Sequence, residues 1–128
     1  METEKLCLNF ILFILKPKAE SILGEIEYVK SNIVYQLRNI DRLVKPNPVE
    51  KSIATLFDDA FFIYEPHGVV LIIGAWNYPV QLILGPLVGA ISAGNCAIIK
   101  PSEVSPATSN VISELLPRYL DKVKCQLF

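Results

Sequence analysis

The sequence has little of what metal sites and disulfide frameworks need. His67 is the only histidine among 128 residues, which excludes a histidine-rich metal site, and we expect no bound metal. The three cysteines, Cys7, Cys96 and Cys125, are too few and too widely spaced for a disulfide scaffold or a zinc site. We therefore expect a reducing compartment and place the protein in the cytoplasm.

An excess of charge of either sign is also lacking. The chain has 12 Lys and Arg against 13 Asp and Glu, a net charge of −1, which argues against a nucleic-acid partner and a polybasic membrane patch. No clear membrane span is present either, because the apolar run at residues 6–15 is about half the roughly 20 residues that a spanning helix needs. We treat residues 1–18 as an apolar leader of uncertain structure, either a buried or partner-facing segment or a signal or anchor.

What is present is a chain rich in apolar residues. Hydrophobic residues make up 52% of the sequence and charged residues 20%, a composition too apolar for intrinsic disorder. The length suits one domain, and a mean hydropathy of +0.39 indicates more apolar surface than such a domain can cover alone. We therefore expect the isolated chain to be marginally stable or to self-associate.

A long amphipathic helix is predicted over residues 22–44. Its apolar residues recur at steps of three and four, the spacing of one helical stripe, while polar residues such as Glu25 and Glu27 fill the other face. Pro46 and Pro48 end the pattern. The stripe fits either a helix packed on its own domain or a coiled-coil or dimer seam. The stripe consists of Ile22, Ile26, Val29, Ile33, Leu37, Ile40 and Val44.

The second half of the chain alternates between strand and helix patterns. Continuous apolar runs at 69–73 and 96–100 are typical of strands covered on both faces, and helices are predicted at about 79–93 and 106–120. Two strands joined by a helical crossover should be parallel, with a right-handed connection. The fold class is therefore α/β, a partial Rossmann-like parallel sheet in the order strand–helix–strand–helix, preceded by the long amphipathic helix.

Local signals support these boundaries. Pro79 suits the first turn of a helix, Gly94 suits a left-handed cap at its end, and Ser105 with Pro106 suits the start of the last helix. An aromatic and β-branched run at residues 60–64 predicts one further short strand.

Polar residues follow both predicted parallel strands. Ligands of open α/β sheets bind beyond the carboxyl ends of the strands, so the loops at 74–78 and 100–103 should meet at one edge. Asn77 in the first loop could donate a hydrogen bond to a developing oxyanion. Lys100 and Glu103 in the second loop suit the hydroxyls of a nucleotide ribose, although an Asn in a turn and a solvated Lys–Glu pair are the plainer interpretations. Neither glycine-rich phosphate motif occurs in the sequence.

These residues lie within a stretch that resembles the aldehyde dehydrogenase superfamily. The motifs WNYP, PLVGAISAGN and KPSE follow one another in that order and at that family's spacing. The resemblance extends from about residue 19 to residue 122 and is closest to the branch of fatty and medium-chain aldehyde dehydrogenases. It implies that residues 19–128 form part of an NAD(P)-binding domain, as an N-terminal fragment.

The resemblance assigns roles to seven residues. Asn77 corresponds to the amide that stabilises the oxyanion, and Lys100 and Glu103 correspond to contacts with the adenosine ribose of NAD or NADP. In the family, the main chain of the first loop lies along the cofactor. The resemblance therefore implies secondary cofactor-binding candidates at Ile73, Gly74, Ala75 and Trp76. A glutamate at the ribose favours NAD, whereas the lysine tolerates a 2′-phosphate, so both NAD and NADP remain possible cofactors.

The family's reaction is the NAD(P)-dependent oxidation of aldehydes to carboxylic acids by a cysteine nucleophile and a glutamate base. In the family both residues lie beyond the segment matched here, so we expect this chain to lack turnover of its own. Cys96 begins a buried strand and is interpreted as a core residue, since burial raises the pKa of a thiol. Two alternatives remain: a non-catalytic partner or regulator that docks onto a full-length relative, or a residual nucleotide-binding module. A homo-oligomer, such as a dimer, is compatible with each.

Overall fold

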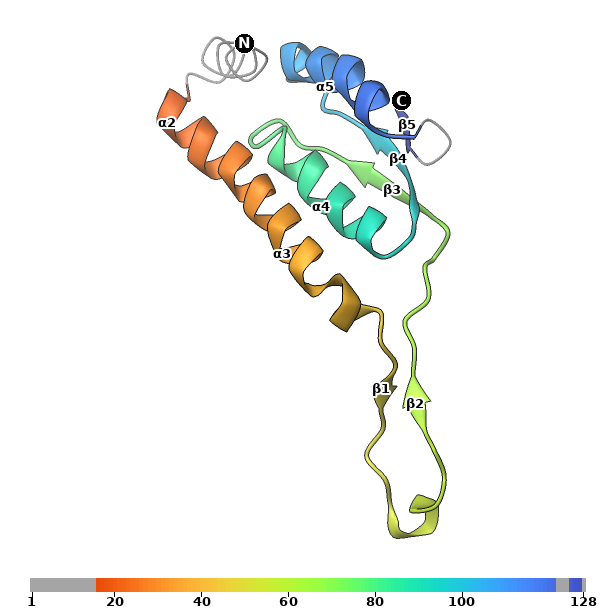
Figure 1. Ribbon diagram of the computed structural model, residues 1–128. Helices are drawn as coiled ribbons and strands as arrows, with labels where there is room; N and C mark the ends of the chain where they lie inside the picture. Colours follow the sequence, from red (N-terminus) through yellow and green to blue (C-terminus); the bar gives the residue numbers. More distant parts are fainter. Residues whose placement is uncertain (1–15, 122–124, 128) are drawn as a thin grey trace.

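The computed structural model describes residues 16–121 and 125–127 (Figure 1). The apolar run at residues 6–15 and Cys7 lie outside the described residues. The elements follow the order α2, η1, α3, β1, η2, β2, β3, α4, β4, α5 and β5.

The first half of the structure is a long helix made of three successive segments. α2 (Lys18–Ser21) passes into a π-helical segment η1 (Ile22–Glu27) and then into α3 (Tyr28–Leu43). The predicted helix is therefore confirmed, and it starts four residues earlier than expected. It packs lengthwise against α4 (Gln81–Ser92), as the alternative of a helix packed on its own domain requires (Figure 1).

The sheet has three parallel strands in the order β3 (Val69–Ile73), β4 (Cys96–Lys100) and β5 (Cys125–Leu127). β3 and β4 pair from Val69 with Cys96 to Ile73 with Lys100. Both predicted strands and their parallel direction are thus confirmed, as is the partial Rossmann-like fold class. The third strand was not predicted, because its three residues carry no apolar run and pair only through a partner distant in sequence.

One face of this sheet carries the hydrophobic core. α4 crosses over β3 and β4, and α5 (Pro106–Tyr119) contributes to the same core. The other face is uncovered in the described part of the chain: Ile72 is 6% exposed, whereas Leu71 is 63% exposed. The expectation of strands covered on both faces is therefore wrong for β3 in the described part of the chain, since one helical layer covers one face only. The core consists of Ile72, Val80, Ile83, Leu87, Ala97, Ile99 and Ile112.

The predicted boundaries of the two later helices, α4 and α5, agree with the structure to within about two residues. Gly94, just after α4, has a φ of +78°, the left-handed conformation expected there. Pro106 occupies the first turn of α5, as predicted. The Ser105 hydroxyl does not cap that helix; it donates to the carbonyl oxygen of Ser102, 3.4 Å away.

Between α3 and β3 the chain forms a projecting two-stranded arm (Figure 1). β1 (Asn47–Pro48) pairs antiparallel with β2 (Phe61–Phe62), and the short 3-10 helix η2 (Ile53–Thr55) lies between them. The strand predicted at residues 60–64 is confirmed only for its two phenylalanines. None of the helices formed by residues 16–121 has the length and apolar character needed to cross a bilayer.

Candidate functional site

The carboxyl ends of β3 and β4 lie level with each other. Ile73 pairs with Lys100, and the next residue, Gly74, donates its N–H to the carbonyl oxygen of Lys100 at 2.9 Å. This hydrogen bond extends the ladder one residue beyond β3. The loops at 74–78 and 100–103 therefore leave the sheet at one edge, as the sequence predicts.

Gly74 also lets α4 approach the end of β3. A Cβ at this position would lie 2.5 Å from Cγ1 of Ile83 and 2.9 Å from its Cδ1, closer than side-chain contacts allow. Because Gly74 is buried, its main chain is all that it can offer to a ligand. The neighbouring Ile73, Ala75 and Trp76 are exposed.

An exposed ion pair occupies the second loop. The Lys100 Nζ lies 2.7 Å from Oε2 of Glu103 and donates a hydrogen bond to it. This hydrogen bond, a second one from the Glu103 backbone and the charge of Lys100 together lower the pKa of Glu103 below its ordinary value of 4.5. The carboxylate is therefore ionised at neutral pH and remains an acceptor.

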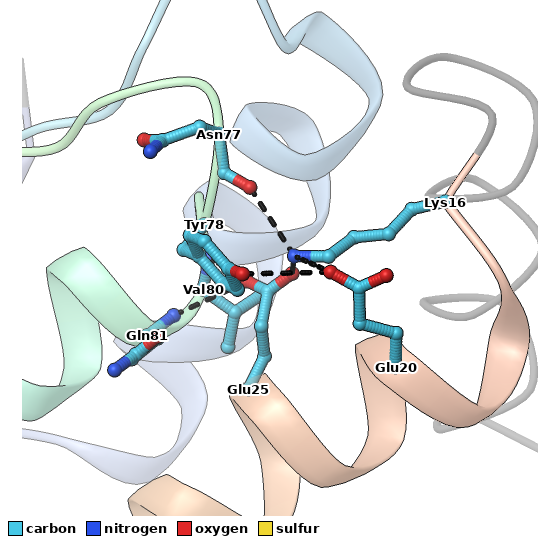
Figure 2. A network of polar contacts seen from close by, with 7 residues as sticks. All are labelled: Lys16, Glu20, Glu25, Asn77, Tyr78, Val80 and Gln81. Atoms are coloured by element: carbon cyan, nitrogen blue, oxygen red, sulfur yellow. Dashed lines mark hydrogen bonds and ion pairs between the residues drawn. The ribbon is translucent and has the colours of Figure 1, made fainter.

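Asn77 is exposed in the first loop. Its side-chain amide points away from the polar contacts formed by its own main chain (Figure 2). The main-chain oxygen of Asn77 accepts a hydrogen bond from the Nζ of Lys16 at 3.3 Å. The loop is thus held by its backbone while the amide is turned outward.

The residue that anchors this loop was misassigned from the sequence. Glu25, placed on the polar face of the long helix, is 0% exposed, and its Oε2 accepts the N–H of Val80 at 2.9 Å. The Nζ of Lys16 lies 3.5 Å from the other carboxylate oxygen (Figure 2). Ser21, Glu25 and Val29 are spaced four residues apart and all three are buried, but no local pattern in the sequence marks the glutamate as enclosed.

The two described cysteines are free thiols. Desolvation first, and then the nearby Cys96 and Asp121, raise the pKa of Cys125. A raised pKa reduces the thiolate fraction and with it nucleophilicity. Within residues 16–121 and 125–127, no group of three metal-ligating side chains is close enough to hold a metal ion.

The architecture is that of the parallel α/β proteins that bind ligands at the carboxyl edge of the sheet. The family model described as "Aldehyde dehydrogenase family" matches residues 14–121. The chain belongs to the aldehyde dehydrogenase family, which confirms the resemblance of its motifs.

Several mammalian relatives are about half identical to this chain. It is 49% identical over 107 residues to aldehyde dehydrogenase family 3 member B1 of Bos taurus, covering 84% of this chain and 23% of that protein. It is 52% identical over 102 residues to family 3 member A2 of Rattus norvegicus, covering 80% of this chain and 20% of that protein. Both relatives are named as members of aldehyde dehydrogenase family 3, and the chain spans less than a quarter of their length.

Solved structures share the fold. The substrate-bound state of Staphylococcus aureus AldH superposes with a TM-score of 0.84 and 30% identity, over 99% of this chain and 30% of that one. The succinic semialdehyde dehydrogenase of Streptococcus pyogenes, solved with NADP+, gives a TM-score of 0.79 over 95% of this chain and 26% of that one. At 19% identity the second comparison shows the fold alone.

Proposed function

We propose that the chain forms part of the nucleotide-binding domain of an aldehyde dehydrogenase that oxidises aldehydes to carboxylic acids with NAD or NADP. One observation carries the proposal: the Ile73–Lys100 register and the Gly74–Lys100 hydrogen bond bring both loops to one edge. A nucleotide lying across that edge would meet residues of both loops.

Lys100 and Glu103 are the proposed contacts to the adenosine ribose. The ionised Glu103 carboxylate can accept from ribose hydroxyls, and the Lys100 ammonium can donate to a hydroxyl or to a 2′-phosphate. Both side chains are exposed, so a ligand can reach them without displacing a core residue. The pair leaves both NAD and NADP possible.

The first loop is proposed to lie along the rest of the cofactor. Trp76 is 53% exposed, which leaves a large face for a ligand to contact, while Gly74 contributes main chain only. When bound, the nicotinamide supplies a hydride acceptor. The four residues proposed for this segment are Ile73, Gly74, Ala75 and Trp76.

Asn77 is proposed to stabilise the oxyanion that forms when a thiolate adds to the aldehyde carbonyl. A side-chain amide N–H aimed at the developing charge stabilises it without reorganising at the moment of reaction. The outward orientation of the Asn77 amide supports this role (Figure 2). We do not assign the nucleophile to Cys96 or Cys125.

A calorimetric titration of NAD+ into the 128-residue chain tests the nucleotide site. We expect a saturable isotherm that weakens roughly tenfold in Glu103→Gln, the usual scale of a hydrogen bond to a charged group. The matched control is Glu114→Gln, an exposed glutamate that pairs with Arg118 in α5, which should bind like the wild type. No saturable binding of NAD+ or NADP+ by the folded chain would contradict the proposal.

Turnover is a separate question. We expect the chain alone to produce no NADH or NADPH from aliphatic or aromatic aldehydes. Measurable turnover that is lost in Asn77→Ala would overturn that expectation and would support the oxyanion role.

A second candidate function is docking onto a full-length relative. The uncovered sheet face, with Val69, Leu71 and Ile73 all more than half exposed, favours it because parallel sheets are usually covered on both faces. Co-purification of the chain with such a relative would support docking, and separate elution would exclude it. The free thiols Cys96 and Cys125 suit the reducing cytoplasm, where we place either form.

A further inference from the structure

A buried carboxylate lies beneath the loop that carries Asn77. Glu25, in the π-helical segment η1, is fully buried although it is separated from the loop by more than fifty residues of sequence. Its Oε2 accepts the N–H of Val80 at 2.9 Å and approaches the N–H of Gln81 at 3.4 Å. A charged side chain that is buried this completely needs compensating partners, because its desolvation is costly.

Those two N–H groups belong to the start of α4, and no residue of the helix itself caps them. Val80 occupies the N-cap position and makes no side-chain cap hydrogen bond. An apolar N-cap leaves donors of the first turn without partners, and a carboxylate at this end also interacts favourably with the helix dipole. Glu25 therefore caps α4 from a different helix.

Lys16 completes the arrangement. Its Nζ lies 3.5 Å from Oε1 of Glu25, an oxygen that accepts no hydrogen bond within the described residues. The same Nζ donates to the main-chain oxygen of Asn77 at 3.3 Å and sits 3.3 Å from the centroid of the Tyr78 ring (Figure 2). One buried ammonium thus links the carboxylate to both residues at the end of the loop.

We propose that Glu25 and Lys16 are positioning residues for the loop at residues 74–78. Glu25 fixes where the loop enters α4, and Lys16 fixes the Asn77 main chain, so that the amide faces outward. Neither residue touches substrate in this scheme. The inference rests on the proposed function only in that Asn77 belongs to the site.

The loop carries its own probe, because Trp76 is the only tryptophan in the chain. Acrylamide quenching of its fluorescence measures how accessible the indole ring is to solvent, and this accessibility increases when the loop moves away from the domain. We expect quenching to increase and the emission maximum to shift to the red in Glu25→Leu. Glu25→Gln, which retains an acceptor oxygen for Val80, should fall between Glu25→Leu and the wild type.

Hydrogen exchange provides the second readout. In Glu25→Leu we expect the protection of the peptide spanning residues 76–82 to fall roughly tenfold, the scale of a lost hydrogen bond to a charged group. Protection across β4, residues 96–100, should stay at the wild-type level. Lys16→Met should change both readouts in the same direction as Glu25→Leu.

Glu27→Gln is the matched control. Glu27 lies two residues away in the same segment and also pairs with a lysine, Lys30 at 2.7 Å, but on the exposed surface. It should leave the fluorescence of Trp76 and the exchange of residues 76–82 unchanged.

The inference is overturned if Trp76 quenching and the exchange of residues 76–82 stay at wild-type values in Glu25→Leu. An equal loss of protection at residues 76–82 and 96–100 also overturns it, because it would indicate global destabilisation. If Glu25→Leu does not fold, Glu25→Gln and Lys16→Met decide by the same criteria. If none of the three folds, the pair determines folding as a whole, and the positioning role is rejected.

Neither readout needs a nucleotide, so the two proposals fail independently. If the wild-type chain binds no NAD+ but Glu25→Leu increases Trp76 quenching and the exchange of residues 76–82, the proposed function is contradicted and the positioning role is kept. If instead the wild-type chain binds NAD+ but Trp76 quenching and the exchange of residues 76–82 are unchanged in Glu25→Leu, the proposed function is kept and the positioning role is rejected.

Discussion

Gly74 and Ile83 are in such close contact that a side chain at position 74 would force Ile83 or the end of β3 to shift. Ile83 is fully buried, and a Cβ on Gly74 would lie 2.5 Å from its Cγ1. The helix that follows the candidate loop is thus pressed against the strand that precedes it. This contact holds the two ends of the loop at residues 74–78 close together and so restricts the conformations of the loop.

Gly74→Ala should therefore destabilise the protein. Inserting a methyl group into a well-packed core costs about 1–3 kcal/mol, which chemical denaturation would measure. Gly89→Ala is the matched control in α4, where a Cβ would meet nothing within 4 Å. Since alanine is favoured over glycine inside a helix by about 1 kcal/mol, this control should be stabilising. Equal effects of the two substitutions would contradict the tight contact.

The Lys100–Glu103 pair makes a prediction about titration. Lys100→Met removes both the hydrogen bond and the charge that lower the pKa of Glu103, so this pKa should rise toward 4.5. Carboxyl carbon shifts in an NMR titration would measure it.

The sign of the pH dependence follows from the same shift. A pKa that is lower in the folded state stabilises the protein above pH 4.5, and this contribution is lost as the pH falls through the native pKa. Lys100→Met should reduce that dependence. A Glu103 pKa equal in the two proteins would show that the ion pair does not persist in solution.

The uncovered sheet face predicts self-association of the chain when it is expressed alone. Contiguous exposed apolar side chains favour association at roughly 25 cal/mol for each Å² removed from water. Leu71→Lys, on that face, should shift sedimentation toward the monomer with little loss of stability. Ile72→Lys, one residue along and buried, should instead unfold the chain. A wild-type chain that sediments as a monomer and melts cooperatively would contradict this prediction.

The raised pKa of Cys125 predicts slow alkylation. At pH 8 iodoacetamide should react with Cys125 more slowly in the folded chain than in urea, because burial disfavours the thiolate. Peptide mass spectrometry would follow the residue separately from Cys96. Equal rates in the two conditions would show that the thiol is not desolvated in solution.

Local patterns in the sequence were sufficient for most of the fold. The steps of three and four predicted the long helix, and the apolar runs at 69–73 and 96–100 predicted two strands and their crossover. Each of these signals arises within a few neighbouring residues, where periodicity and turn chemistry act directly. Because parallel strands place the loops that follow them at the same edge of the sheet, the common edge of these two loops was predictable as well.

Long-range contacts decided the rest. The sequence by itself determined the helices, the two central strands and the motifs that identify the family, since those depend on local periodicity and residue spacing. Only the tertiary structure decided that Glu25 is buried, that Lys16 reaches Asn77 and that residues 125–127 extend the sheet. Whether a charged side chain is solvated or enclosed depends on which distant segment packs over it, and no pattern within one helix specifies that partner.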